Sequence, residues 1–279
     1  MTNGECVGFL QWALPQLGLR WPGFHKVRRQ VHKRLNRRLA ELGLAGIADY
    51  KAHLETHPEE WPRLDALCRI SISRFYRDRS VFDHLGDALL PALAEAAIAR
   101  RENQVRCWSI GCASGEEIHT VVILWNVHLQ PRFPRVRLQA TGTDTDEQML
   151  QRARRAEYPA SSLKDLPPGW RETAFAQSGA LYILRAEFQR PVEFRQQDIR
   201  TEMAAGAFHL VLCRNLVLTY FAAELQRQVL QRIVEHIVPG GFLVVGRHET
   251  LPEGVDGLLP YRPDLGVYRS PEPAEQGRC

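Results

Sequence analysis

The residues best suited to chemistry lie within 105–117, VRCWSIGCASGEE. A β-rich run enters a turn made only of small residues, beginning at Gly111, and two carboxylates, Glu116 and Glu117, follow before an apolar, helix-like run at 118–125. Small side chains leave backbone open to a ligand, while the two acids would repel a phosphate and attract a cation. The pattern favours a small, positively charged cofactor, and S-adenosylmethionine fits better than a nucleotide polyphosphate.

Two other ligand classes fit this turn less well. A dinucleotide fingerprint needs G-x-G-x-x-G with the helix start free for pyrophosphate, but this turn lacks that spacing and carries two acids there. A phosphate-binding loop needs G-x-x-x-x-G-K-[ST], and no lysine follows Gly115. The plainest alternative stays open: an ordinary strand-to-helix turn whose acids favour the positive end of the helix.

A second predicted strand also ends in acids. Alternating apolar positions over 136–142 predict the strand, and a helix is expected at 147–156. An acid at the end of the second strand often holds a ribose through its hydroxyls, so we expect Asp144 to do this. Asp146 could instead be the N-cap of the helix, so one of the two aspartates is expected to be structural.

A third predicted strand, 192–196, is short and is followed by Gln197, Asp198 and Ile199. A polar group and an apolar side chain here could border and cover an adenine ring. The segment therefore extends the expected cofactor site beyond the first two strands.

A near-continuous apolar run at 208–213 is typical of a central parallel strand buried on both faces. Arg214 and Asn215 follow it, at the carboxyl end of a strand, where open α/β sheets bind ligands. An amphipathic helix is expected at 224–238 and is predicted to stop at Pro-Gly-Gly, 239–241.

Strands alternate with helices over about 160 residues, which predicts a Rossmann-like, doubly wound, mostly parallel α/β sheet. The first part of the chain has an all-helical pattern. The expected organisation is a helical domain at 1–98, a linker at 99–104, a cofactor-binding domain at 105–269 with a small antiparallel excursion at 181–194, and a flexible tail at 270–279.

Charge is unevenly distributed along the chain. No acid occurs between Glu5 and Glu41, where eight basic residues fall, so the rest of this +4 chain has a net charge of −4. Apolar residues recur there at helical spacing, which predicts a basic helix over 20–40. It could be a solvated helix face or a docking surface for an acidic protein; nucleic acid is disfavoured because no binding motif appears. The basic residues are Arg20, Lys26, Arg28, Arg29, Lys33, Arg34, Arg37 and Arg38.

Composition excludes several protein classes. No run of 18 apolar residues and no signal-peptide pattern occurs, so we expect a cytoplasmic protein without membrane insertion. None of the six cysteines forms a C-x-x-C pair, so no metal site or disulfide framework is expected.

Taken in order, these segments resemble the CheR-type chemotaxis receptor methyltransferases, whose fold is the class I methyltransferase type. That family transfers a methyl group from S-adenosylmethionine to glutamate side chains. The resemblance covers nearly the whole chain, and the ordered set is more specific than any single motif. The matching segments are RLNRRLAELGL (34–44), SISRFYRD (71–78), WSIGCASGEE (108–117), GTDTD (142–146), FHLVLCRN (208–215), YF (220–221) and PGGFLVVGRHE (239–249).

The resemblance implies roles for individual residues. Glu116 or Glu117 would hold the methionine end of the cofactor, and Asp144 the ribose. The reaction itself would take place near Tyr220, with Arg214 beside the methyl group and Arg77 steering the acceptor carboxylate or bracing the cofactor. The remaining implied cofactor contacts are Ser71, Ser73, Gly111, Asp198, Ile199 and Asn215. The basic helix 20–40 would face the methylated helices of a receptor.

Some positions depart from the family pattern. Ser71 stands where the family has Asn, Ser73 where it has Thr, and one extra residue lies between Asn215 and Tyr220. Two alternatives therefore stay open: a methyltransferase for a small molecule or a different protein side chain, and a non-catalytic module that binds S-adenosylmethionine.

Overall fold

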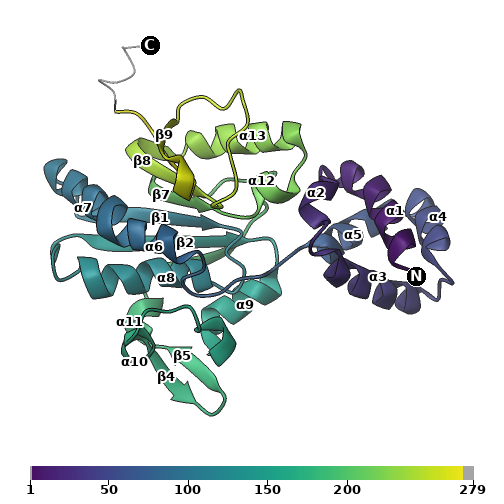
Figure 1. Ribbon diagram of the computed structural model, residues 1–279, viewed down its shortest axis with the longest axis horizontal. Coiled ribbons are helices and arrows are strands. Elements are labelled where there is room, and N and C mark those ends of the chain that lie inside the picture. The colour runs from purple at the N-terminus through teal and green to yellow at the C-terminus, as the bar shows by residue number, and fades with distance from the viewer. Residues whose placement is uncertain (1, 273–279) are drawn as a thin grey trace. The chain divides into compact units, whose positions relative to one another are not determined.

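The computed structural model describes residues 2–272, which form two compact units (Figure 1). The smaller unit contains the chain up to Ser71 together with Thr219–Gln226, and the larger unit contains the remaining described residues. No helix between residues 2 and 272 has both the length and the hydropathy of a membrane span.

The smaller unit is helical, and its longest helix is α3 (Arg28–Leu42). Val31, Leu35 and Leu39 recur every four residues and are buried, which explains why this strongly basic segment packs as a helix. Gly43 ends α3 in the left-handed conformation. The other elements of this unit are α1 (Asn3–Ala13), η1 (Leu14–Leu17), α2 (Trp21–Phe24), α4 (Ile47–Thr56), η2 (Pro58–Glu60) and α5 (Trp61–Cys68).

A seven-stranded sheet forms the larger unit, with the order β6-β2-β1-β7-β8-β10-β9. The first five strands in this order are mutually parallel, whereas β10 runs antiparallel to both β8 and β9. The strand order reverses between β1 and β7, so the carboxyl ends of these strands border the crevice where such sheets bind ligands. The strands are β1 (Gln104–Ile110), β2 (Arg137–Asp144), β6 (Val192–Gln196), β7 (Phe208–Cys213), β8 (Ile237–Val245), β9 (Leu259–Arg262) and β10 (Val267–Arg269).

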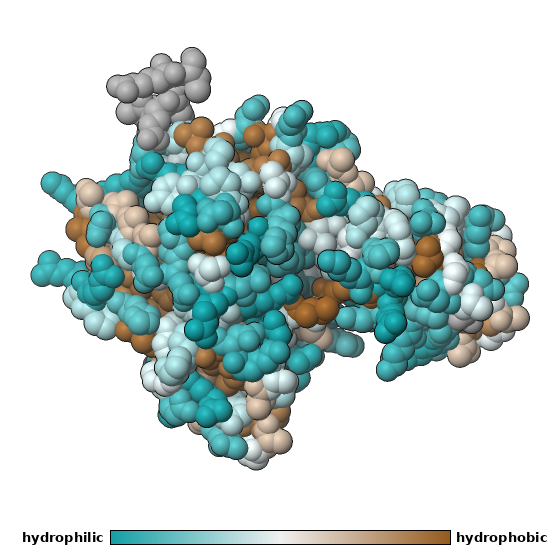
Figure 2. All heavy atoms as spheres, viewed as in Figure 1, coloured by the Kyte–Doolittle hydropathy of each residue, from teal (hydrophilic) through white to brown (hydrophobic). Residues whose placement is uncertain are grey.

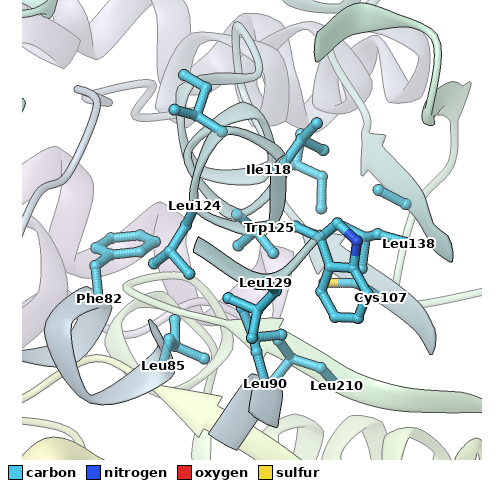
Figure 3. Close-up of a cluster of buried hydrophobic side chains, with 14 of the residues drawn as sticks. Phe82, Leu85, Leu90, Cys107, Ile118, Leu124, Trp125, Leu129, Leu138 and Leu210 are labelled. Atoms are coloured by element: carbon cyan, nitrogen blue, oxygen red, sulfur yellow. The ribbon is translucent and has the colours of Figure 1, made fainter. Parts of the chain in front are cut away.

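Helices and strands share one apolar core in the larger unit. Figure 3 shows Trp125 and Leu124 of the α8 region between Phe82, which precedes α7, and Cys107 of β1. All six residues of β7 are buried, as expected for a central parallel strand. The helical segments of this unit are α6 (Arg79–His84), η3 (Leu85–Leu89), α7 (Leu90–Ala99), α8 (Glu116–Leu124), η4 (Trp125–Leu129), α9 (Glu147–Arg155), η5 (Ala160–Ser162), α10 (Trp170–Ala174), α11 (Ala186–Gln189) and η6 (Pro263–Leu265).

The remaining elements are a second sheet and two helices shared by both units. β3 (Glu157–Pro159), β5 (Leu181–Leu184) and β4 (Phe175–Ser178) form a three-stranded antiparallel sheet in that order. Helices α12 (Val217–Tyr220) and α13 (Ala223–Val234) each contribute residues to both units.

The expected fold class is confirmed: an all-helical N-terminal part accompanies a mostly parallel α/β sheet. The boundary differs from the expected 1–98, because the helices of 79–99 pack in the core of the larger unit. The antiparallel excursion also differs from 181–194: it draws strands from 157–184, while 192–196 belongs to the main sheet.

One expectation near the carboxyl end of the chain needs correction. The helix predicted at 224–238 ends at Val234, and the Pro-Gly-Gly at 239–241 lies within β8 instead of following the helix, because β8 pairs with β7 from Ile237 onward. Of the expected flexible tail, Ser270 donates its N–H to Gly241 and Glu272 pairs with Arg100. The rest of that tail lies outside the described residues.

Candidate functional site

The turn between β1 and α8 is wound tightly against the ends of β2 and β7. Gly111 and Gly115 have φ values of +69° and +86°, which glycine adopts without steric cost. The N–H groups of Gly111 and Cys112 donate to the carbonyl of Thr143 at 2.8 and 3.0 Å. A Cβ added at Gly111 would lie 2.7 Å from Leu216 Cδ2. The small residues of the turn therefore allow three strand ends to meet closely.

Asp144 joins the first two loops of the site. Its Oδ2 accepts the N–H of Ala113 and its Oδ1 accepts the N–H of Asp146, both at 2.9 Å. A carboxylate accepts about four hydrogen bonds, so one side chain can hold both loops and receive ribose hydroxyls. Asp146 accepts the N–H groups of Gln148 and Met149 and is the N-cap of α9, so it is the structural member of the pair.

Glu116 lies in the first turn of α8 and is only 2% exposed. The Ser114 hydroxyl lies 3.0 Å from each of its carboxylate oxygens, and Ser73 also hydrogen-bonds to it. Burial raises the pKa of Glu116, although these hydrogen bonds oppose the rise. The expected cofactor residues Ser73 and Glu116 are thus brought together, with the Glu116 charge partly desolvated in the site.

Glu117 and Arg214 belong to a second charged cluster. The Arg214 side chain is 2% exposed; its Nη1 donates to Glu117 Oε2 at 2.9 Å and its Nη2 to Asp78 Oδ2 at 2.5 Å. Its guanidinium carbon lies 5.3 Å from the centre of the Phe82 ring, a cation–π contact. Glu117 also accepts the hydroxyl of Ser109. Two carboxylates therefore balance the buried positive charge of Arg214, and the ion pairs hold the cluster together.

Arg77, Ser71 and Tyr220 were also predicted to be site residues, and their contacts differ from those of the residues described above. Arg77 turns its Nη1 to the carbonyl of Ile72 at 2.9 Å, and its own carbonyl accepts Arg214. Ser71 and Tyr220 belong to the smaller unit, where the Tyr220 ring packs on Phe24 with 5.0 Å between ring centres. Their roles in catalysis and cofactor binding stay predictions.

Asn215 depends on a residue for which no site role was predicted. It has a φ of +55°, a left-handed conformation that asparagine tolerates better than most residues. Glu249 Oε2 accepts the N–H of Asn215 at 3.0 Å and that of Gly246 at 2.6 Å, which ties the ends of β7 and β8 together. A glutamate four residues after a buried strand was the available signal, but its partner lies 34 positions away.

The segment after β6 contributes two buried residues and one ion pair. Ile199 is 5% exposed and Gln197 is 7% exposed, and the N–H of Gln197 donates to the carbonyl of Asp144 at 2.9 Å. The Asp198 carboxylate instead receives the backbone N–H and the guanidinium of Arg200. The segment adjoins Asp144, and its acid is bound to a neighbouring arginine; its contact with adenine stays a prediction.

A buried tyrosine and histidine hold the turn after β1 through hydrogen bonds, and no site role was predicted for either residue. Tyr158 donates its hydroxyl to the carbonyl of Ser114 at 2.8 Å, and His119 Nδ1 lies 2.9 Å from the same hydroxyl. Since the tyrosine proton goes to Ser114, His119 must be the donor in its own contact. Burial lowers the pKa of His119 to about 3, so the ring is neutral.

Comparison with known proteins agrees with this geometry. Residues 71–260 match the family described as CheR methyltransferase, SAM binding domain, and residues 25–65 match the family's all-alpha domain. A chemotaxis protein methyltransferase of Salmonella typhimurium is 31% identical over 233 residues, covering 81% of this chain and 76% of that protein. One from Listeria monocytogenes is 29% identical over 210 residues, covering 75% and 77%. Chemotaxis protein methyltransferase 2 of Pseudomonas aeruginosa is 30% identical over 226 residues, covering 78% and 77%.

Proposed function

Because this chain belongs to the CheR methyltransferase family and takes its methyl group from S-adenosylmethionine, we propose that it methylates glutamate side chains of a protein, specifically a chemoreceptor. The relatives carry the name chemotaxis protein methyltransferase, and the resemblance of the segments 34–249 implies the same acceptor. The proposed setting is the cytoplasm, where cysteines stay reduced; the five described cysteines are free and buried.

One observation gives the strongest support to the proposed binding of S-adenosylmethionine. Asp144 holds the loop after β1 and the loop after β2 together at the end of the parallel sheet, directly beside the acidic turn. A carboxylate there suits ribose hydroxyls, and Glu116 places negative charge where a cationic methionine end would lie. In this proposal the nucleoside lies against Asp144 and the amino-acid end against the start of α8.

The proposed chemistry needs no general base. A glutamate carboxylate is ionised at pH 7, and the methyl of a sulfonium is already activated for in-line displacement. Alignment of the carboxylate, the methyl and the sulfur can contribute roughly 7–11 kcal/mol. The charge cluster of Arg214, Glu117 and Asp78 supports such alignment, because it fixes the end of β7 to the segment at Arg77.

We further propose that the acceptor protein docks on part of the basic helix. Four of the eight basic side chains donate hydrogen bonds within the smaller unit: Arg20 to the carbonyl of Thr219, Arg28 to that of His25, Arg34 to that of Leu67, and Arg38 to the Glu60 carboxylate. The other four are exposed and recur every three or four residues along α3 and the turn before it. The surface over this region is hydrophilic in Figure 2. We call this set the basic stripe: Lys26, Arg29, Lys33 and Arg37.

The test of the proposed function uses S-adenosylmethionine labelled in the methyl group. We expect label to enter a chemoreceptor cytoplasmic fragment with glutamate at its methylation positions, to be absent when those positions are glutamine, and to be released by base as a carboxyl ester is. Label on small molecules alone, or base-stable label, would identify a different acceptor. Binding of the cofactor with no transfer to any acceptor would indicate a binding module.

Asp144→Asn tests the cofactor site directly. We expect it to weaken binding of S-adenosylhomocysteine, measured by calorimetry, by about tenfold or more, because a charged hydrogen bond acceptor is worth roughly 1.5–3 kcal/mol. The matched control is Asp146→Ala, which removes the N-cap of α9. It should cost about 1 kcal/mol of stability and leave the affinity nearly unchanged. Equal affinities in wild type and Asp144→Asn would remove Asp144 from the site.

A further inference from the structure

One buried polar group at the sheet edge has no partner within the described chain. Gln197 is 7% exposed, and its Oε1 makes no hydrogen bond to any atom of residues 2–272. Nearly all buried polar side-chain atoms in proteins are hydrogen-bonded, because an unpaired one costs free energy. An amide kept in this state is therefore expected to meet its partner when a ligand binds.

The position of Gln197 indicates which part of the ligand it meets. It follows the last residue of β6, and its N–H donates to the carbonyl of Asp144 at 2.9 Å. Asp144 is the residue that we expect to hold the ribose. Adenine is bonded directly to that ribose, so the base must lie within a few ångströms of the Asp144 side chain. The backbone of Gln197 is thus fixed beside the residue that would hold the ribose, and the base would lie next to it.

The neighbouring acid is less suited to this role. The Asp198 carboxylate accepts from Arg200 at its backbone N–H, at Nε and at Nη2, with distances of 2.9, 3.0 and 2.7 Å. A carboxylate can only accept hydrogen bonds, whereas an amide can both donate and accept. Adenine presents an amino donor next to a ring-nitrogen acceptor, and glutamine pairs with such an edge through two hydrogen bonds.

We propose that Gln197, and not Asp198, recognises the edge of the adenine ring and makes the site selective for a 6-amino purine. The inference rests on the proposed placement of the nucleoside against Asp144. It assigns to Gln197 the discrimination between adenine and bases that lack the amino group, while the ion pair of Asp198 with Arg200 shapes the loop after β6.

The experiment measures by calorimetry the affinity of wild type and of Gln197→Leu for two ligands. The ligands are S-adenosylhomocysteine and its analogue with unsubstituted purine in place of adenine. Wild type is expected to bind the purine analogue about tenfold or more weakly, since a site built for a hydrogen bond rejects a ligand that lacks it. Gln197→Leu is expected to bind S-adenosylhomocysteine about as weakly as the purine analogue, and so to lose the discrimination.

The matched control is Gln177→Leu, an exposed glutamine on β4 that donates to Gly179; it should keep both affinities. Gln197→Leu removes an unpaired buried oxygen, so its melting temperature without ligand should equal or exceed that of wild type. If Gln197→Leu fails to fold, Gln197→Glu serves in its place, and it should show a reduced preference for adenine because it cannot donate to the ring nitrogen.

The proposal is overturned if the variant at Gln197 discriminates between the two ligands as strongly as wild type does. This failure differs from failure of the proposed function. If wild type binds neither ligand, the cofactor site itself is wrong; if wild type binds and discriminates but Gln197 has no part in it, only this inference is wrong.

Discussion

Single buried side chains set the ionisation of the site. His119 is enclosed beneath the turn after β1, where burial lowers its pKa to about 3 from an ordinary value of 6.5. Glu116, one turn earlier in α8, has its pKa raised by the same desolvation. Both shifts disfavour the charged form, as expected for a dry environment. Burial thus keeps the His119 ring neutral, whereas hydrogen bonds to the Glu116 carboxylate oppose the rise of its pKa.

The lowered pKa of His119 predicts a pH dependence of stability. Unfolding lets the ring take up a proton below pH 6.5, while the folded protein resists protonation down to about pH 3. The contribution of His119 is therefore fully present above pH 6.5 and is lost as the pH falls toward 3, at up to about 1.4 kcal/mol per pH unit. His119→Gln, which does not titrate, should flatten this part of the profile. Urea unfolding between pH 7 and 4 measures it, and identical slopes in both proteins would contradict the assignment.

At the scale of elements, strands β2 and β6 and the loop after β1 approach one another closely around the Phe194 ring. A Cβ added at Gly142 would lie 2.8 Å from two ring carbons of Phe194 and 3.1 Å from the sulfur of Cys112. A Cβ at Gly115 would lie 3.0 Å from the same ring. Because Gly142 has no side chain, β6 and the loop after β1 can approach β2 this closely.

Gly142→Ala should destabilise the protein by about 1–3 kcal/mol, because an extra methyl in a filled site forces its neighbours to shift. Combining it with Phe194→Leu, which removes the obstructing ring, should cost less than the sum of the two single changes. Gly8→Ala in α1 is the control, since nothing lies within 4 Å of its added Cβ, and it should stabilise by up to about 1 kcal/mol. Chemical denaturation measures all four variants; strict additivity would show that the contact is not the cause.

At the scale of the whole molecule, positive charge is concentrated in the first part of the chain. Eight basic residues and no acid fall between Glu5 and Glu41, although the protein carries only +4 in total. The basic stripe defined above carries four of these eight charges on exposed side chains. Long-range attraction of an acidic partner speeds association and weakens as salt increases.

The basic stripe predicts a salt-dependent reaction. Lys33→Glu combined with Arg37→Glu should lower kcat/KM for an acidic receptor fragment by about tenfold at low salt. The variant should also be less sensitive to salt than wild type, with little change in affinity for S-adenosylhomocysteine. Lys33→Glu alone is compared with Arg63→Glu, an exposed arginine on α5 outside the stripe, because each single substitution changes the net charge by the same amount. Equal loss in these two single variants would mean that only net charge matters.

Local patterns in the sequence determined much of the fold and part of the site. The strands predicted at 192–196 and 208–213 coincide with β6 and β7. The small-residue turn before Glu116 and the acid at Asp144 also fall where they were expected, at the ends of β1 and β2. These features depend on periodicity and on turn residues, which are encoded within a few neighbouring positions.

Only the tertiary structure decided which side chains meet. Arg214 pairs with Asp78 across 136 positions, and Glu249 reaches the N–H of Asn215 across 34. Packing also assigned the helices of 79–99 to the larger unit and extended β8 back to Ile237. Such contacts depend on how distant elements pack together, and a charged residue in the sequence does not specify which distant partner will neutralise it once water is excluded.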